Sequence, residues 1–134
     1  MEALAIKKSI VVNAAFLCLA HALVIAMVRV NGDPKYKSYT HGYGLKKHVE
    51  DLLEASGVDL SNGGGLEELR QFQKYLPDNK IVVFDGLRPD RHIFSGNFLS
   101  AKKLYLLYYS DSGHYNVITN IKECHGQEMH MKRV

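Results

Sequence analysis

The sequence has few cysteines and no concentration of basic charge, and these two shortages exclude whole classes of protein. Only two cysteines, Cys18 and Cys124, occur among 134 residues, too few for a disulfide framework. The net charge is only +3, and the basic residues are scattered rather than arranged in a stripe with interleaved aromatics, as is typical of nucleic-acid-binding proteins. We therefore expect an intracellular protein, cytoplasmic or nuclear, whose domain binds no nucleic acid.

Signatures of bound nucleotides and metal ions are also missing. The glycine run 63–65 is not followed by the Lys-Ser or Lys-Thr pair that a phosphate-binding loop requires. Cys124, His125 and His130 are residue types that bind metals, but the four ligands of a structural zinc site are not visible. We expect no metal and no cofactor.

The chain shows no internal repeat and no domain boundary, which favours a single domain. A length of 134 residues is enough to bury most of the apolar surface that the unfolded chain exposes. The hydrophobic and charged fractions, 46% and 23%, are typical of folded soluble proteins. We expect one monomeric domain over residues 1–121 and a polar tail over residues 122–134.

One long hydrophobic run, Ile10–Val28, raises the question of a membrane segment. Its length is at the lower end of what crosses a bilayer, and residues 20–22 could serve as a signal-peptide cleavage site. However, Asn13 and His21 would be costly to place in hydrocarbon, and a core helix that is apolar all round has the same sequence pattern. We favour a buried helix over residues 17–28 and no membrane association, with a membrane-anchored protein as the alternative.

Hydrophobic spacing predicts helices in the first half of the chain and strands in the second. Leu45, Val49 and Leu52 recur at helical spacing, Gly57 is suited to end their helix, and β-branched runs later in the chain indicate strands. We expect helices over residues 17–28, 45–56 and 66–76, and strands over residues 81–84, 92–94, 104–109 and 114–119, with residues 10–12 forming a strand or an extended lead-in. This order indicates the α+β class, with helices packed on a small, mostly antiparallel sheet.

Cys18 and His114 are the candidate catalytic pair. Cys18 falls in the first turn of the first expected helix, where the helix dipole favours a thiolate, although a cysteine in an apolar helix is more typical of a buried core residue. His114 begins the last expected strand, with Asn116 on the same face. The Asn116 carbonyl could accept from one imidazole nitrogen and leave the other to face a thiol, as in Cys-His-Asn triads. Spacing alone favours an ordinary surface hairpin for this pair.

Several segments occur in the order and spacing of the ovarian-tumour (OTU) family of cysteine proteases. They are Leu17–Leu23, Gly65–Leu69, Ile81–Phe84, Leu104–Tyr109 and His114–Asn116. They resemble, in turn, the family's nucleophile motif, its Gly and Glu-Leu helix, its next core strand and its terminal hairpin. Asp33–Lys37 and His114–Lys122 are more narrowly similar to the OTU-type domain that precedes the DNA polymerase in Polinton (Maverick) elements.

The resemblance implies a papain-like OTU fold and a deubiquitinase that hydrolyses (iso)peptide bonds after the C-terminal glycine of ubiquitin or a ubiquitin-like modifier. It implies Cys18 as the nucleophile, His114 as the general base and Asn116 as the residue that orients the imidazole. We therefore expect the Cys18 sulfur to approach a ring nitrogen of His114. The substrate-binding residues that the resemblance implies are Gly64, Gly65 and Tyr115.

The sequence departs from the family at the loop that would bind the oxyanion. The family usually has Asp three residues before the nucleophile, and this chain has Ala15 there. Backbone amides from Ala15 to Cys18 could still form the oxyanion hole, because it needs N–H groups rather than one particular side chain, and Asn13 could supply a side-chain amide. The departure also supports an alternative, a catalytically weak or inactive ubiquitin-binding or scaffold domain of the same fold.

Overall fold

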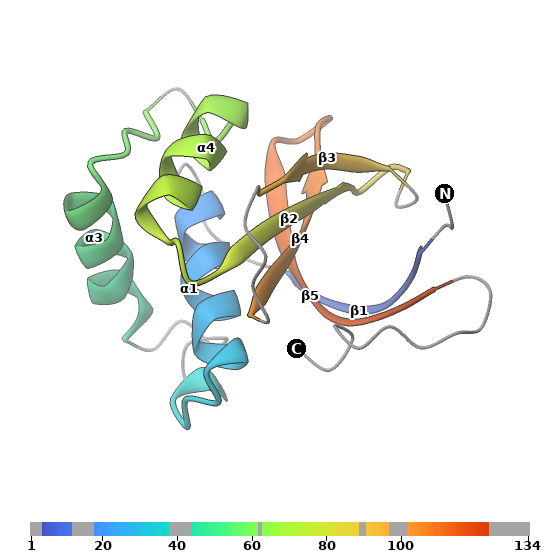
Figure 1. Cartoon of the computed structure of the whole chain (residues 1–134), viewed down its shortest axis with the longest axis horizontal. Helices are drawn as coiled ribbons and strands as arrows, with labels where there is room; N and C mark the ends of the chain where they lie inside the picture. Colours follow the sequence, from blue (N-terminus) through green and yellow to red (C-terminus); the bar gives the residue numbers. More distant parts are fainter. Residues whose placement is uncertain are drawn as a thin grey trace.

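The computed structural model describes residues 4–11, 18–37, 44–61, 63–88, 91–96 and 102–123, with the backbone alone for 4–11 and 120–123. The helices in these ranges are α1 (Cys18–Val30), α3 (Leu45–Ser56) and α4 (Leu66–Tyr75). The strands are β1 (Leu4–Val11), β2 (Lys80–Asp85), β3 (His92–Ser95), β4 (Lys103–Tyr109) and β5 (His114–Glu123). Figure 1 shows the helices gathered on one side of a strongly curved sheet.

The described strands form one mixed sheet in the order β1-β5-β4-β2-β3. The pairs β1–β5, β4–β5 and β2–β3 are antiparallel, whereas β2 and β4 are parallel. The parallel pair arises because the chain leaves β2, forms the edge strand β3 and then returns to lie along the other side of β2. The expected α+β class and the mostly antiparallel sheet are therefore confirmed.

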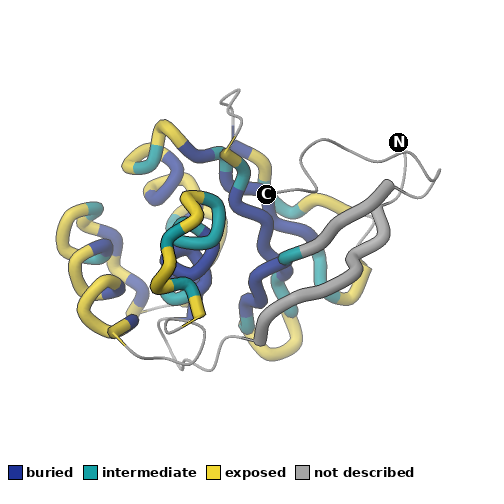
Figure 2. The backbone as a smooth tube through the Cα atoms, turned by 90° about the horizontal axis from the view of Figure 1, so that it is seen from below, coloured by how far each residue is buried: buried dark blue, intermediate teal, exposed yellow. Residues whose placement is uncertain are grey.

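Helix α1 is the centre of the core. Its residues from Cys18 to Ala26 are buried apart from His21, which is partly exposed. It packs against β5 and β4 on one side and α3 on the other, which explains why nearly every face of this helix is apolar. Figure 2 shows that the helices bury the turns that face the interior of the molecule and expose their outer turns. None of the helices in the described ranges is long and apolar enough to cross a membrane.

The other two helices each bury one stripe of side chains, as their spacing predicts. In α3, Leu45, Val49 and Leu52 are buried. Gly57 ends α3 in the left-handed conformation, with φ of 71°, and its N–H donates to the Leu53 carbonyl, which is the usual role of glycine after a helix. In α4, the buried stripe includes Leu69 and Phe72, and the helix ends before Pro77.

The strands alternate between the two faces of the sheet. Leu106 of β4 and Val117 of β5 pack in the cluster that contains α1, whereas Leu107 and Ile118 pack in a second cluster on the opposite face. Strand β5 is longer than expected and continues to Glu123, paired with β1. Lys122 and Glu123, which the sequence analysis assigned to the polar tail, therefore belong to the sheet because β1 supplies their backbone partners.

Candidate active site

The structure places Cys18 and His114 at the start of two adjoining elements, α1 and β5. The Cys18 Sγ atom lies 3.5 Å from Nδ1 of His114, although the two residues are 96 positions apart in the sequence. The expected approach of the sulfur to a ring nitrogen is confirmed. This separation is within the loose contact range of nucleophile and base side chains in unliganded enzymes, so the geometry permits a thiol–imidazole proton transfer.

The hairpin between β4 and β5 fixes the position of His114. The turn ends at Gly113, whose φ of 67° lies in the left-handed region that glycine adopts without strain. The Gly113 N–H donates to the Tyr109 carbonyl at 2.8 Å, and Tyr109 then pairs with His114 across the two strands. His114 therefore directly follows a hydrogen-bonded turn, which fixes the position of its backbone.

The backbone of Tyr115, in β5, contacts the Cys18 sulfur through both its N–H and its carbonyl group. The Tyr115 N–H donates to Cys18 Sγ at 3.0 Å, and the Cys18 thiol is placed to donate to the Tyr115 carbonyl at 3.4 Å. The Cys18 residue is only 3% exposed. The nucleophile candidate is therefore held between the first turn of a buried helix and the beginning of a strand.

Burial raises the pKa of the Cys18 thiol, and the hydrogen bond from the Tyr115 N–H lowers it by a smaller amount. This direction is opposite to the one expected from the helix dipole. The physical reason is that removing a thiolate from water is costly, and the residue is almost completely buried. The resting site therefore holds a neutral thiol rather than a preformed thiolate.

Asn116 lies on the same strand face as His114, but the expected hydrogen bond between their side chains is not formed. Both His114 Nε2 and Asn116 Oδ1 are buried and have no hydrogen-bond partner among the residues that the structure describes. Side chains two residues apart on a strand are parallel and stand about 7 Å apart, so the amide and the ring have to turn toward each other to meet. Nε2 of His114 can donate and Oδ1 of Asn116 can accept, so these two atoms are able to pair with each other.

The glycine loop before α4 lies against the same site. The Tyr115 hydroxyl donates to the Gly64 carbonyl at 2.6 Å. A Cβ atom at Gly64 would lie 2.8 Å from Cδ2 of Leu19, the residue that follows the nucleophile candidate. The loop therefore needs glycine at this position in order to pack on α1, a reason for Gly64 that does not involve substrate.

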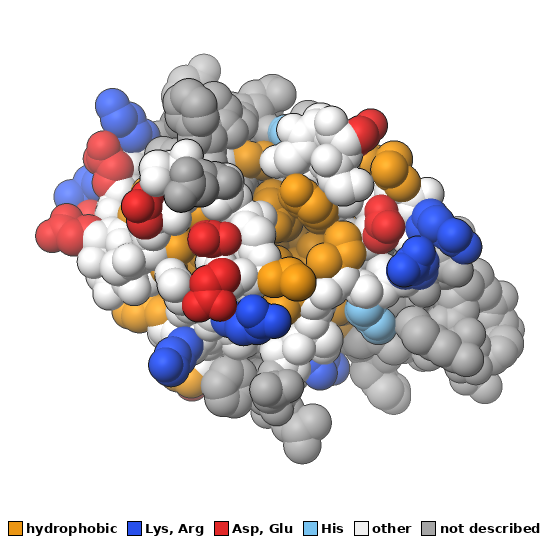
Figure 3. Space-filling view, turned by 90° about the horizontal axis from the view of Figure 1, so that it is seen from above, with side chains coloured by type: hydrophobic (Ala, Val, Ile, Leu, Met, Phe, Trp, Pro, Cys, Tyr) orange, Lys and Arg blue, Asp and Glu red, His pale blue; other side chains and the backbone are white. Residues whose placement is uncertain are grey.

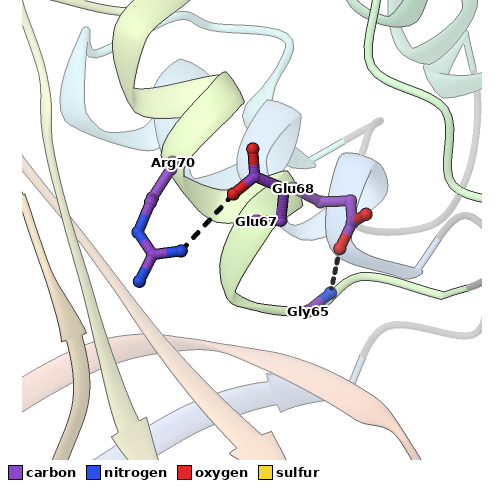
Figure 4. Close-up of polar contacts among 4 residues, drawn as sticks. All are labelled: Gly65, Glu67, Glu68 and Arg70. Carbon is purple, nitrogen blue, oxygen red and sulfur yellow. Dashed lines mark hydrogen bonds and ion pairs between the residues drawn. The ribbon is translucent and has the colours of Figure 1, made fainter.

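The sequence analysis missed Glu68, whose carboxylate accepts from the Gly65 N–H at 2.8 Å. Figure 4 shows this contact at the first turn of α4, beside the exposed ion pair of Glu67 and Arg70. The Gly-x-x-Glu spacing supplies half of a capping box. With Ser or Thr at the first position, the capping-box pattern would be recognisable in the sequence, but with glycine it is not.

A groove with a volume of about 630 Å³ runs between α4 and β3 and is lined at the first turn of α4 by Leu66 and Glu67. Its apolar lining includes Leu66, Ile93 and Phe94. Figure 3 shows hydrophobic side chains gathered in a hollow on this side of the molecule, with acidic side chains beside it. Cys18 and His114 do not line this groove.

Other candidates from the sequence lie outside the described residues. These are the oxyanion-hole candidates Asn13 and Ala15, and the metal-binding types Cys124, His125 and His130. Within the ranges that the structure describes, no group of three or more His, Cys, Asp or Glu side chains is arranged to hold a metal ion.

Comparisons of the chain with protein-family models, with curated proteins and with solved structures found no match. The site therefore has to be interpreted from its own chemistry and from the sequence resemblance.

Proposed function

We propose that the chain is a cysteine protease domain of the OTU type, with a papain-like fold, that hydrolyses (iso)peptide bonds after the C-terminal glycine of ubiquitin or a ubiquitin-like modifier. The observation that carries the proposal is the 3.5 Å contact between Cys18 Sγ and His114 Nδ1. Cys18 lies at a helix N-terminus and His114 at the start of a late strand. This arrangement supports the proposal, because the OTU resemblance assigns the nucleophile and the base to these two places.

In the proposed reaction the Cys18 thiol passes its proton to Nδ1 of His114 while the sulfur attacks the glycine carbonyl. His114 then gives this proton to the departing lysine amine, which leaves a thioester on Cys18. Water, deprotonated by His114, hydrolyses the thioester and restores the thiol. Because burial keeps the resting thiol neutral, His114 has to act as a true general base during the attack.

Two further groups complete the proposed machinery. The backbone N–H of Cys18 is the first of helix α1 and has no carbonyl partner within the helix, so it is suited to donate to the oxyanion of the tetrahedral intermediate. Asn13 and Ala15 are the other oxyanion-hole candidates. Asn116 orients the imidazole once its carbonyl accepts from Nε2 of His114, the ring nitrogen that is unpaired in the resting site.

The choice of ubiquitin rests on the sequence resemblance, and the shape of the site is compatible with it. A modifier tail is an extended chain that ends in two glycines and needs a narrow path to the thiol. Leu66, which follows Gly65 in the sequence, lines the groove between α4 and β3, and a Cβ atom at Gly64 would contact Leu19 beside the nucleophile. In this proposal, Gly64, Gly65 and Tyr115 form the wall between the groove and Cys18.

A second candidate function is a ubiquitin-binding or scaffold domain that keeps the fold and has little or no activity. It is favoured by the buried thiol with its raised pKa and by the missing hydrogen bond between Asn116 Oδ1 and His114 Nε2. Ala15, where the family usually has Asp, points in the same direction.

Turnover of ubiquitin carrying a fluorogenic C-terminal amide separates the two candidates. The enzyme proposal expects hydrolysis by the wild type and loss of hydrolysis in Cys18→Ala and His114→Ala, with ubiquitin binding retained in both variants. Binding by the wild type without turnover would favour the scaffold. Absence of both binding and turnover would refute ubiquitin as the partner.

A further inference from the structure

The Gly64–Gly65 peptide group is held by side chains at both of its polar ends. Its carbonyl oxygen, on Gly64, accepts from the Tyr115 hydroxyl at 2.6 Å. Its N–H, on Gly65, donates to a Glu68 carboxylate oxygen at 2.8 Å (Figure 4). Both bonds oppose a flip of this peptide group, one at its carbonyl end and one at its N–H end.

The two side chains that hold this peptide group come from different parts of the fold. Tyr115 belongs to β5, and its own N–H donates to the Cys18 sulfur. Glu68 belongs to the first turn of α4, in which Leu66 and Glu67 line the groove between α4 and β3. The held peptide group therefore connects this turn to Tyr115, whose backbone contacts the nucleophile candidate.

Tyr115 is well suited to this task because it is itself rigidly placed. Only 2% of the residue is exposed, and its ring packs against the ring of Tyr108, with centroids 4.7 Å apart. The Glu68 carboxylate lies close enough to Tyr115 to contribute to the raised pKa of its phenol, after the larger effect of burial and the effects of Tyr108 and Cys18. The hydroxyl therefore remains a proton donor to Gly64 at all physiological pH values.

We propose that Glu68 and Tyr115 are positioning residues that together fix the Gly64–Gly65 peptide group as a rigid wall of the path to Cys18. The two hydrogen bonds carry the structural part of this inference. Its catalytic part rests on the proposed function. Because Glu68 occupies the Gly65 N–H, this N–H does not donate to a bound acyl chain. The wall therefore selects its substrate by shape and accepts chains without side chains at the positions that pass it.

The structural part is tested by amide hydrogen exchange of Gly65, measured by ¹⁵N NMR in the whole chain. In Glu68→Ala the Gly65 amide is expected to exchange about tenfold faster or more, the factor that corresponds to one hydrogen bond to a charged group. Glu68→Gln retains a side-chain oxygen that can accept and is expected to restore most of the protection. Tyr115→Phe is expected to speed the exchange by a smaller factor.

Glu67→Ala is the matched control, because Glu67 is the neighbouring acidic residue and forms an ion pair with the exposed Arg70. We expect it to leave Gly65 exchange unchanged. If Glu68→Ala leaves the Gly65 amide as protected as in the wild type, or if Glu67→Ala affects it equally, the inference is overturned.

The catalytic part is tested by steady-state hydrolysis of the fluorogenic ubiquitin amide. A loosened wall lowers the fraction of molecules that can bind, which raises the apparent dissociation constant. We therefore expect Glu68→Ala to raise KM about tenfold with little change in kcat and Glu68→Gln to restore KM. Glu54→Ala changes an exposed acidic residue of α3 that does not line the groove, and it is expected to match the wild type. A loss confined to kcat would overturn the positioning role. A wild type without turnover would refute the proposed function, and the exchange pattern would still decide whether the wall is fixed.

Discussion

Gln73 offers a sharp test of how the fold supports the site, because its buried side-chain amide connects the end of α4 to the start of β2. Its Nε2 donates to the carbonyls of Leu76 at 3.0 Å and Asn79 at 2.6 Å, and its Oε1 accepts from the Ile81 N–H at 2.8 Å. Gln73 is only 5% exposed. These contacts fix the orientation of β2 relative to α4. Because β3 pairs with β2, they also help to shape the groove between α4 and β3.

Gln73→Met removes all of these hydrogen bonds while keeping a side chain of similar length. The Leu76 carbonyl keeps a second donor, the Asn79 N–H, so the Ile81 N–H and the Asn79 carbonyl are the groups that lose these partners. Each buried polar group left unpaired costs about 1–3 kcal/mol. We therefore expect the free energy of unfolding to fall by about 3 kcal/mol, and the midpoint of thermal unfolding to fall by about 10 °C.

Urea denaturation followed by far-UV circular dichroism measures this change. Gln71→Met is the matched control, since Gln71 lies on the same helix and is exposed. It is expected to change the free energy of unfolding by less than about 0.5 kcal/mol, as is usual at surface positions. If the two variants agree within this margin, the Gln73 amide does not stabilise the connection and the reasoning is refuted.

Asn116→Ala is expected to lower kcat/KM for ubiquitin hydrolysis less than His114→Ala, because the base takes part in proton transfers worth about 10²–10⁴-fold in rate; equal losses in two folded variants would show that the roles are misassigned. Alkylation of Cys18 by iodoacetamide should rise with pH at a midpoint above that of an ordinary thiol, about 8.5, because burial raises its pKa, and a lower midpoint would contradict the neutral resting thiol. The same shift predicts that the stability gained from the neutral thiol is complete below the ordinary thiol pKa and is lost as pH rises through the raised pKa. Gly64→Ala should lower the free energy of unfolding by about 1–3 kcal/mol, since its Cβ would lie 2.9 Å from Cβ of Leu19; an unchanged urea midpoint would refute the close packing of the loop.

Local sequence patterns predicted the elements of this fold well and their arrangement less well. The helix expected over residues 45–56 has those bounds, because an apolar stripe and a following glycine define both of its ends. Strand β5 continues past its expected end, because pairing with β1 holds its last residues, most of which are polar. The parallel pairing of β2 with β4 depends on contacts between distant segments that no local pattern contains.

The candidate site was predictable where it depends on the positions of elements, and less so where it depends on side-chain detail. The order of the OTU-like segments, with Cys18 at a helix start and His114 at a strand start, predicted the contact between these residues, and the structure contains it. The direction of the thiol pKa was not predictable, because it depends on how deeply Cys18 is buried. The role of Glu68 was not predicted, because its carboxylate accepts from the backbone N–H of Gly65. Glycine at the first position hides the capping-box pattern that would otherwise indicate this contact.

Reaction with ubiquitin that carries an electrophile at its C-terminus tests most directly whether Cys18 is the nucleophile of a ubiquitin-directed protease. We expect one covalent adduct, seen as a single mass increase, that is formed by the wild type and by Cys124→Ala and is abolished by Cys18→Ala. His114→Ala should form it much more slowly, since the neutral thiol then lacks its base. An adduct that persists in Cys18→Ala, or a wild type that remains unmodified, would contradict the account.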